Sequence, residues 1–391
     1  MTATAAPTLS REEELHWLAL NLIPGLGTRM AGKLLDRFRT PQAAFRASRT
    51  ELEAAGISGA VAQSIASGCS FEDALDQQQK ITERGAVVVT RSDPRYPALL
   101  REIFDPPILL FARGRLGLLQ PFHFAVVGTR RPTPYGLAVA ERLAADLARA
   151  GLTIVSGMAR GIDTAAHKGA LSAGGDTIAV LGCGVDIIYP SENRRLAADL
   201  AARGLIISEY AMGSVAFPQN FPVRNRIISG MSTGTLVVEG AQYSGSAITA
   251  KLAIDQGREV FAIPGNITSK SSWGPNLLIK QGAKLVQDWN DVIVDLPAEV
   301  RRQLIERGRA RLLGSGDASG KEGAASTEAG SLPEIGRRLL AVLPVDSPTH
   351  LDDLLQIVED SSASELIAAL FELEMLGLVK QLPGKNFVKV W

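Results

Sequence analysis

The sequence predicts an α/β protein with an extended Rossmann-like parallel sheet as its core. Between residues 124 and 238, five short apolar segments alternate with helical segments, and a sixth follows at residues 260–263. Strands this apolar are covered on both faces, and their alternation with helices indicates a parallel, doubly wound sheet. Glycines such as Gly151, Gly174 and Gly204 suit the ends of the intervening helices. With 391 residues, the chain also exceeds the usual size of one core, so further domains are expected.

Composition limits the classes of function. The formal net charge is zero, so a nucleic-acid site must be a local patch of positive charge. Cys69 and Cys183 lack C-x-x-C spacing and are expected to be reduced thiols in a cytoplasmic protein. The four histidines are scattered, so no metal site is predicted. Neither a secretion signal nor a membrane-spanning run is recognisable, which predicts a cytoplasmic protein with no membrane association.

The N-terminal part is predicted to be a disordered segment, residues 1–10, followed by a helical domain, residues 11–84. Apolar residues recur there at helical spacing. The glycine turn at residues 23–27, before the helix 28–37, resembles the hairpin of a helix-hairpin-helix module, with a weaker copy at residues 55–59. The alternative is a small bundle similar to a sterile-alpha-motif (SAM) fold. Arg29, Lys33 and Arg37 lie on one helix side, so DNA contact by the hairpin stays open.

The central domain is predicted to span residues 85–300 and to begin its parallel sheet at the stretch 124–136. An apolar run ends at Gly128, two arginines follow, and a helical pattern begins near Tyr135. Glycine lets the backbone approach a ligand closely, and the helix start favours an anion. Arg130 and Arg131 make phosphate the most plausible anion. The alternative is an ordinary strand–helix turn with surface arginines.

The carboxyl ends of the predicted strands carry the candidate site, because ligands bind beyond those ends in sheets of this kind. Backbone N–H groups and guanidinium groups there can hold phosphates, and an aromatic ring can stack an unpaired base. No catalytic residue, metal ligand or cofactor is predicted. The predicted DNA-binding residues are Gly128, Thr129, Arg130, Arg160, Phe221, Arg224, Asn225, Arg226, Ser244, Gly245 and Ser246.

The C-terminal part is predicted to be a linker, residues 301–331, and a winged-helix domain, residues 332–391. Three helical segments precede a hairpin with a Pro-Gly turn. A winged helix usually binds duplex DNA through its third helix. The third helix here carries Glu365, Glu372 and Glu374 and neither lysine nor arginine, and carboxylates repel phosphate. A protein-interaction role, or one indifferent to duplex DNA, is therefore favoured for this domain, and a duplex-DNA regulator is disfavoured.

Four segments together resemble the DNA-processing protein A family, called DprA or Smf. They are VVGTR, SGMARGID, AVLGCGVDIIYP, and FPVRNRIISG running on through LVVEG, SGSAITA and VFAIPG. They cover residues 126–265 almost continuously, and the flanking helical and winged-helix parts fit the three-domain members. The resemblance implies a cytoplasmic, non-enzymatic protein that binds single-stranded DNA during natural transformation. It also implies that the protein protects incoming strands, loads the RecA recombinase against single-strand-binding protein, and forms a homodimer through the Rossmann-like domain.

The resemblance also assigns roles to residues. Arg130 grips the strand and Phe221 stacks a base, while Gly128 and residues 244–246 supply backbone or hydroxyl contacts. Arg224 and Arg226 lie near the groove, although Arg226 could equally brace its loop.

Two positions depart from the family pattern. Many members have a lysine at the position of Pro218, so that phosphate contact is absent or is supplied by Arg131 or Arg160. Thr129 stands where serine is more common.

The main alternative is an enzyme. Residues 234–239, GTLVVE, match half of a motif of nucleotide phosphoribohydrolases of the lysine-decarboxylase-like type. Glu239 would then assist cleavage of the glycosidic bond of a nucleoside monophosphate. The P-G-G that precedes this half in those enzymes is replaced by Gly230-Met231-Ser232, which leaves the phosphate cradle incomplete. Binding of single-stranded DNA is therefore the preferred interpretation.

Overall fold

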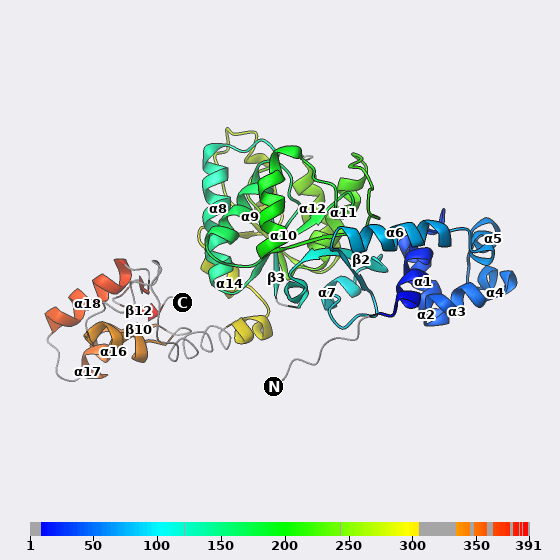
Figure 1. The fold of residues 1–391 in the computed structure, drawn as a ribbon. Helices are drawn as coiled ribbons and strands as arrows, with labels where there is room; N and C mark the ends of the chain where they lie inside the picture. The colour runs from blue at the N-terminus through cyan, green and yellow to red at the C-terminus, as the bar shows by residue number, and fades with distance from the viewer. Residues whose placement is uncertain are drawn as a thin grey trace. The chain divides into compact units, whose positions relative to one another are not determined.

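The chain forms two compact units, Met1–Arg311 and Leu312–Trp391. A computed structural model describes residues 9–120, 122–242, 244–304, 334–344, 348–357, 363–375, 378–382, 384 and 386–389 (Figure 1). Nearly all of the predicted disordered N-terminus and most of the predicted linker at 301–331 lie outside the described residues.

The first unit is built on a sheet of nine strands in the order β1-β2-β6-β5-β4-β3-β7-β8-β9. The strands from β6 to β9 in this order pair in parallel, and β1 and β2 join antiparallel at one edge. The predicted parallel sheet is therefore confirmed. The strands are β1 (Val87–Thr90), β2 (Leu109–Gly114), β3 (His123–Val127), β4 (Thr153–Ser156), β5 (Thr177–Leu181), β6 (Leu205–Ser208), β7 (Gly234–Val237), β8 (Glu259–Ala262) and β9 (Lys284–Leu285).

Helices cover both faces of this sheet, as the apolar strands require. Side chains alternate along a strand, so Val126 joins one buried cluster while its neighbours Ala125 and Val127 join another. The first cluster includes side chains of α8 and α9, and the second includes side chains of α11 and α12. In Figure 1, α8, α9 and α10 lie side by side in front of the sheet. The helices that follow β1 in this unit include α7 (Ala98–Arg101), α8 (Pro134–Arg149), α9 (Ile162–Ser172), α10 (Arg194–Arg203), α11 (Asn220–Gly230), α12 (Gly245–Asp255), α13 (Trp273–Lys280) and α14 (Trp289–Val294).

The N-terminal segment is helical, and its local signals explain where the helices begin. Ser10 and Glu13 form a capping box at the start of α1, and Ser48 and Glu51 form another at the start of α4. Gly25 has a φ of 78°, which glycine adopts without strain, and the turn that contains it leads into α2. The helices are α1 (Arg11–Asn21), α2 (Thr28–Phe38), α3 (Pro41–Arg46), α4 (Arg49–Ala54), α5 (Gly59–Ser67) and α6 (Phe71–Glu83).

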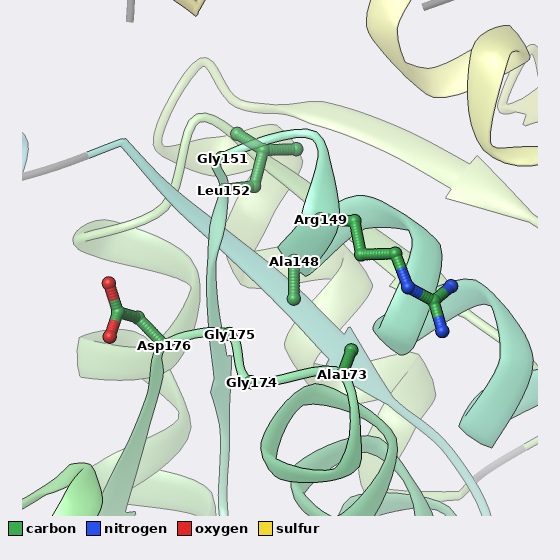
Figure 2. Close-up of a pocket in the computed structure, with 8 residues that line it drawn as sticks. All are labelled: Ala148, Arg149, Gly151, Leu152, Ala173, Gly174, Gly175 and Asp176. Atoms are coloured by element: carbon green, nitrogen blue, oxygen red, sulfur yellow. The ribbon is translucent and has the colours of Figure 1, made fainter. Parts of the chain in front are cut away.

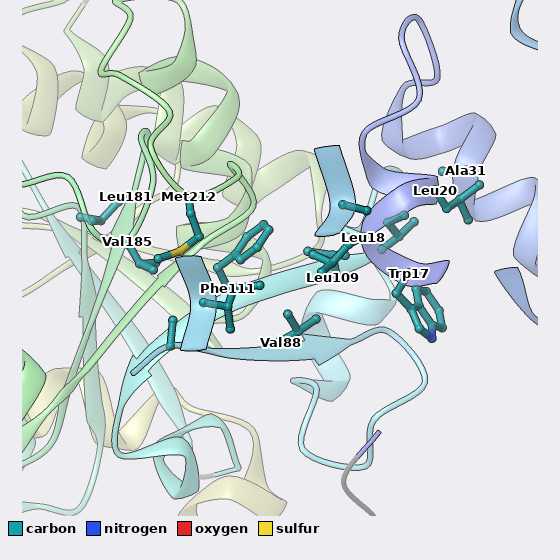
Figure 3. Close-up of a cluster of buried hydrophobic side chains, with 14 of the residues drawn as sticks. Trp17, Leu18, Leu20, Ala31, Val88, Leu109, Phe111, Leu181, Val185 and Met212 are labelled. Carbon is teal, nitrogen blue, oxygen red and sulfur yellow. The ribbon is translucent and has the colours of Figure 1, made fainter. Parts of the chain in front are cut away.

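These helices share a buried core with one edge of the sheet. Leu18 and Leu20 of α1 belong to the same cluster as Phe111 of β2 and Met212, which follows β6 (Figure 3). The Gln77 side chain of α6 donates to the Met212 carbonyl at 3.3 Å and accepts from the Met212 N–H at 2.8 Å. The compact unit therefore contains both parts, and a separate domain at residues 11–84 stays a prediction.

The described residues of the second unit form three helices and a small antiparallel sheet, which agrees with the predicted winged helix. Its core includes Leu339, Leu354, Leu370 and Phe387. The strand β10 was not predicted, because two residues are too short for a recognisable pattern; it pairs with β12, so the sheet order is β10-β12-β11. The elements are α16 (Glu334–Val342), β10 (Thr349–His350), α17 (Leu351–Ile357), α18 (Ala363–Met375), β11 (Val379–Leu382) and β12 (Asn386–Lys389).

Candidate nucleic-acid interface

The candidate site lies at the carboxyl ends of the parallel strands. β3 pairs with β4 on one side and with β7 on the other, so the direction of winding changes at β3. The helices after β3 and β4 pack on one face of the sheet, and α11 and α12 pack on the other. Loops diverge at such a change of direction and leave a crevice that can receive a ligand.

The turn after β3 is held on both sides. Thr129 donates its N–H to the Glu239 carbonyl at 2.7 Å, and its own carbonyl accepts from the Ile162 N–H at 3.2 Å. A Cβ at Gly128 would lie 2.5 Å from the Ile162 side chain, so this glycine is needed for α9 to pack closely. The sequence had suggested a different reason for Gly128, namely that it lets the backbone approach a ligand closely. Arg130 is exposed at the end of this fixed turn.

Phe221, in the first turn of α11, lies next to Arg130. The Arg130 Cζ is 5.3 Å from the centroid of the Phe221 ring. The ring also lies against Gly182 after β5, where an added Cβ would be 3.0 Å from the Phe221 Cδ1. The Tyr189 ring stacks beside it, with centroids 5.3 Å apart and planes 29° apart. Tertiary folding thus brings together a guanidinium group and two aromatic rings from two loops and the first turn of α11.

Tyr189 was missed as a site residue, and it is 43% exposed. It lies in the segment 182–190 that follows β5, and an aromatic residue past a strand end was the available signal.

Arg224 is not a surface residue, which corrects its predicted place among the DNA contacts. It is 3% exposed, and its Nη1 donates to the Gly157 carbonyl at 2.9 Å and to the Val180 carbonyl. Asp163 accepts from the Gly157 N–H at 3.1 Å beside it. Burial lowers the pKa of Arg224 to about 10, although the Asp163 charge opposes this shift. Arg224 therefore braces α11 against the loop after β4 and against β5 itself.

Arg226 is likewise buried, at 5% exposure, and it corrects the expectation of a DNA contact in the same way. Its Nη1 and Nη2 donate to the two carboxylate oxygens of Glu209 at 2.6 and 2.7 Å. Its Nε lies 3.0 Å from the Asp105 carboxylate. Burial is the largest single influence on the pKa of Arg226 and acts to lower it, but the hydrogen bonds to Glu209 and the charges of Glu209 and Asp105 together raise the pKa. The alternative left open for Arg226, that it braces its loop, agrees with this geometry.

The remaining predicted DNA-binding residues differ in how accessible they are to a ligand. Arg160 is exposed and forms an ion pair with Glu192. Asn225 donates to the Gly245 carbonyl at 3.4 Å, which links the starts of α11 and α12.

In the turn that begins α12, the backbone is more available to a ligand than the serine hydroxyl groups are. Ser244 caps α12 by accepting from the Ala247 N–H at 3.3 Å. Ser246 is only 4% exposed, and its hydroxyl is bonded to that of Ser244 at 2.7 Å. Gly245 faces open space, because a Cβ there would meet nothing within 4 Å.

Glu239, the residue of the alternative enzyme hypothesis, has both carboxylate oxygens engaged. Oε1 accepts from the Thr133 hydroxyl at 2.6 Å, and Oε2 accepts from the Thr133 N–H at 2.9 Å. The side chain is 3% exposed and lies against Gly136 in the first turn of α8. This carboxylate therefore fixes the start of α8 next to the β3 turn.

A cavity of about 260 Å³ is found away from the candidate site (Figure 2). Its walls include Leu152 and Asp176, which immediately precede β4 and β5, so it lies at the amino ends of those strands. Its lining residues are Ala148, Arg149, Gly151, Leu152, Ala173, Gly174, Gly175 and Asp176.

Among the described residues, no group of three or more His, Cys, Asp and Glu side chains could hold a metal ion. No described helix combines the length and the apolar character that crossing a membrane requires.

Comparison with known proteins identifies relatives over almost the whole chain. The family model described as DNA recombination-mediator protein A matches residues 87–297, and the DprA winged helix domain matches residues 323–385. Protein Smf of Synechocystis sp. is 33% identical over 401 residues, which cover 97% of this chain and 99% of that protein. The DNA processing protein DprA of Bacillus subtilis is 44% identical over 216 residues, which cover 55% of this chain and 73% of that protein.

Two solved structures are similar as well. The DNA processing protein A of Streptococcus pneumoniae aligns with a TM-score of 0.64 and 35% identity, covering 74% of this chain and 99% of that one. The DNA processing protein A of Helicobacter pylori, whose structure concerns its single-stranded DNA binding mode, aligns with a TM-score of 0.50 and 30% identity. That alignment covers 56% of this chain and 96% of the other. The chain therefore belongs to the DNA recombination-mediator protein A family, also called DprA or Smf.

Proposed function

We propose that this protein binds single-stranded DNA at the carboxyl edge of its parallel sheet. The observation that carries the proposal is the exposed Arg130 residue, whose Cζ lies 5.3 Å from the centroid of the half-buried Phe221 ring. A guanidinium group forms charge-assisted hydrogen bonds with phosphate, and an aromatic ring stacks any base through its π-face. Together they suit a strand without a complement, because stacking requires an unpaired base.

The fixed surroundings of this pair favour binding. The β3 turn is held by hydrogen bonds to Glu239 and from Ile162, and α11 is braced by two buried arginines. Few groups therefore have to be ordered when the strand binds, which reduces the entropic cost. The single-stranded DNA binding mode named for the Helicobacter pylori relative supports the same ligand class.

The biological role is proposed from the family relationship. In this proposal the protein protects incoming strands during natural transformation and helps RecA recombinase replace single-strand-binding protein. It acts in the cytoplasm as a homodimer joined through the sheet-containing unit, and it catalyses no reaction of its own. The relatives named DNA processing protein DprA support the role in DNA processing.

The proposal is tested by titrating full-length protein against a labelled oligonucleotide, single-stranded or annealed to its complement, at one fixed salt concentration. We expect clearly tighter binding of the single strand. The salt concentration must be fixed, because the phosphate contribution to affinity falls steeply with salt. Equal affinity for the two forms, or preference for the duplex, would contradict the proposed function.

A further inference from the structure

Phe104 is an aromatic residue for which the proposed site gives no role. It lies in the loop between α7 and β2, and its side chain is 75% exposed. The guanidinium group of Arg29, from the first turn of α2, lies over its ring with Cζ 4.5 Å from the centroid. Leaving a phenyl ring in water forgoes the free energy of burial, so a stacked ring and guanidinium group on the surface suggest a ligand.

This pair lies at the same edge of the sheet as the proposed site. β2 is antiparallel to β6, and Phe111 of β2 is paired with Ser208, the last residue of β6. The loop that enters β2 therefore lies at the carboxyl end of β6. β6 neighbours β5, and Gly182, which supports Phe221, directly follows β5. Neighbouring strands are about 4.8 Å apart, so two strand spacings, roughly 10 Å, separate β5 from β2.

The Phe104 loop is also tied directly to α11, the helix that begins with Phe221. Arg226 of α11 donates from Nε to the Asp105 carbonyl at 3.2 Å and holds Glu209 with its Nη atoms. On the other side of the loop, Ile103 packs closely on α11, since a Cβ at Gly230 would be 2.8 Å from its side chain. Phe104 is thus held in a defined place relative to Phe221.

The charges around Phe104 favour an anionic ligand. Glu102 lies 3.8 Å from the Arg258 guanidinium, and Asp105 is paired with Arg226, so both nearby carboxylates have a cationic partner. Arg29 and Lys33 add positive charge on the exposed surface of α2.

We propose that Phe104 and Arg29 form a second base-stacking platform for single-stranded DNA. This inference rests on the function proposed above. The bound DNA strand runs from Phe221 along the carboxyl edge of the sheet, past β6, to this platform. A base stacks on the face of the Phe104 ring that Arg29 leaves free, and Arg29 attracts the adjoining phosphate. The helical segment thereby takes part in binding through α2.

The test compares full-length Phe104→Ala with the unaltered protein on two oligothymidylates, one of about 2 nucleotides and one of about 20. A strand of about 2 nucleotides is too short to reach across the roughly 10 Å between β5 and β2, so its binding at the Phe221 site does not involve Phe104. Loss of one stacked base should weaken binding of the longer strand about tenfold and leave the shorter strand unaffected. Equal affinity of Phe104→Ala and the unaltered protein for the longer strand overturns the inference.

Controls separate this inference from the function on which it rests. Phe104→Tyr keeps an aromatic ring and should retain the affinity for the longer strand. Leu75→Ala removes another exposed apolar side chain, on α6, and should change neither affinity. Phe221→Ala should weaken both strands. If Phe221→Ala weakens both while Phe104→Ala weakens neither, the second platform alone is wrong. If Phe221→Ala leaves both strands unaffected, the proposed function itself fails.

Discussion

At the scale of single residues, the arginines of the candidate site fall into two kinds. Arg130 and Arg160 are exposed, whereas Arg224 and Arg226 are buried and bonded to backbone carbonyls or carboxylates. An exposed guanidinium group can exchange water for phosphate at little cost. A buried one would first have to leave a carboxylate or carbonyl unpaired, which costs more than it gains.

Arg130→Ala is expected to weaken single-stranded DNA binding by about 1–3 kcal/mol, since it removes a charge-assisted contact. The slope of log affinity against log salt should become shallower by about 0.7, the value for one phosphate contact with a single strand. Titrations at several salt concentrations measure both quantities. Arg142→Ala is the matched control, because the Arg142 side chain is 84% exposed on α8. Unchanged affinity of Arg130→Ala at fixed salt would remove this residue from the site.

Phe221→Ala is expected to cost about 1–3 kcal/mol of binding free energy through lost stacking. Its salt slope should stay close to that of the unaltered protein, because stacking releases no counterions. The same salt series measures this, with Val294→Ala as an exposed apolar control on α14. A shallower slope at unchanged low-salt affinity would show that the role assigned to Phe221 is wrong.

At the scale of elements, one buried set of hydrogen bonds around Arg224, called the bracket below, connects α11 with the loop after β4 and with β5. Arg224 donates to Gly157 and Val180, and Asp163 accepts from Gly157 and Ala159. Gly157 leaves no room for a side chain, since a Cβ there would lie 2.6 Å from the Arg224 guanidinium. This bracket sets the position of Phe221, three residues before Arg224, without contacting DNA.

Arg224→Met should therefore destabilise the protein strongly, by about 3–5 kcal/mol, because it leaves Asp163 buried without its cationic partner. Thermal unfolding monitored by circular dichroism checks this against Arg130→Ala, which should lie within about 0.5 kcal/mol of the unaltered protein. Any DNA affinity that Arg224→Met retains should keep the original salt slope. A melting temperature equal to that of the unaltered protein, with a shallower slope, would instead indicate a direct phosphate contact.

His167 makes the packing of α9 on the sheet sensitive to acid. Its Nδ1 donates to the Thr177 hydroxyl at 2.7 Å, because that hydroxyl donates onward to the Ile154 carbonyl. Its Nε2 is buried and has no partner among the described residues, so a proton there would be an uncompensated charge. Burial, with a smaller effect from the Arg224 charge, lowers the pKa of His167 to about 3.

The sign of the pH dependence follows from this depressed pKa. The unfolded chain takes up the proton near pH 6.5, whereas the folded protein resists it down to about pH 3. The free energy of unfolding should thus be greatest above pH 6.5 and fall as the pH decreases toward 4. His123, whose pKa burial lowers to about 4, acts in the same direction. Denaturant unfolding at several pH values should show a smaller decrease for His167→Asn. An identical decrease in that variant would exclude His167 as a source.

At the scale of the whole molecule, the distribution of charge matters more than its total. The net charge is zero, and 41 basic residues balance 41 acidic ones. Several cationic side chains are neutralised by carboxylates of the same chain in buried ion pairs, such as Arg226 with Glu209. The second unit carries the acidic residues Glu365 and Glu374 on α18, which would repel DNA there. We therefore expect DNA to be bound by a local patch on the first unit.

The hypothesis of a DNA-binding protein and that of a phosphoribohydrolase-like enzyme are distinguished by one assay. The full-length protein is incubated with nucleoside monophosphates, and the free base released is measured. We expect none to be released, because the Glu239 carboxylate is occupied by Thr133 and shielded from solvent. Glu239→Gln serves as the matched variant and should lower stability by loosening the start of α8. Release of base that disappears in Glu239→Gln would overturn the choice of a binding protein.

Local patterns in the sequence predict most of the larger elements, in the right order and of the right type, but miss short ones such as β9 and β10. Apolar runs, helical spacing and glycine turns are local signals, and each depends on neighbours within a few residues. The predicted parallel sheet and the C-terminal winged helix rest on such signals. The motif segments between residues 126 and 265 also identified the family, as the matched family model confirms.

Tertiary structure alone decided which of the predicted residues meet and which are accessible. Arg130 and Tyr189 come from two loops and Phe221 from the first turn of α11, and their proximity depends on the order of strands in the sheet. Arg224 and Arg226 read in sequence like their exposed counterparts, yet their bonding partners lie at distant positions such as Gly157 and Glu209. Burial is a property of contacts between segments far apart in the chain, so no local pattern could assign it.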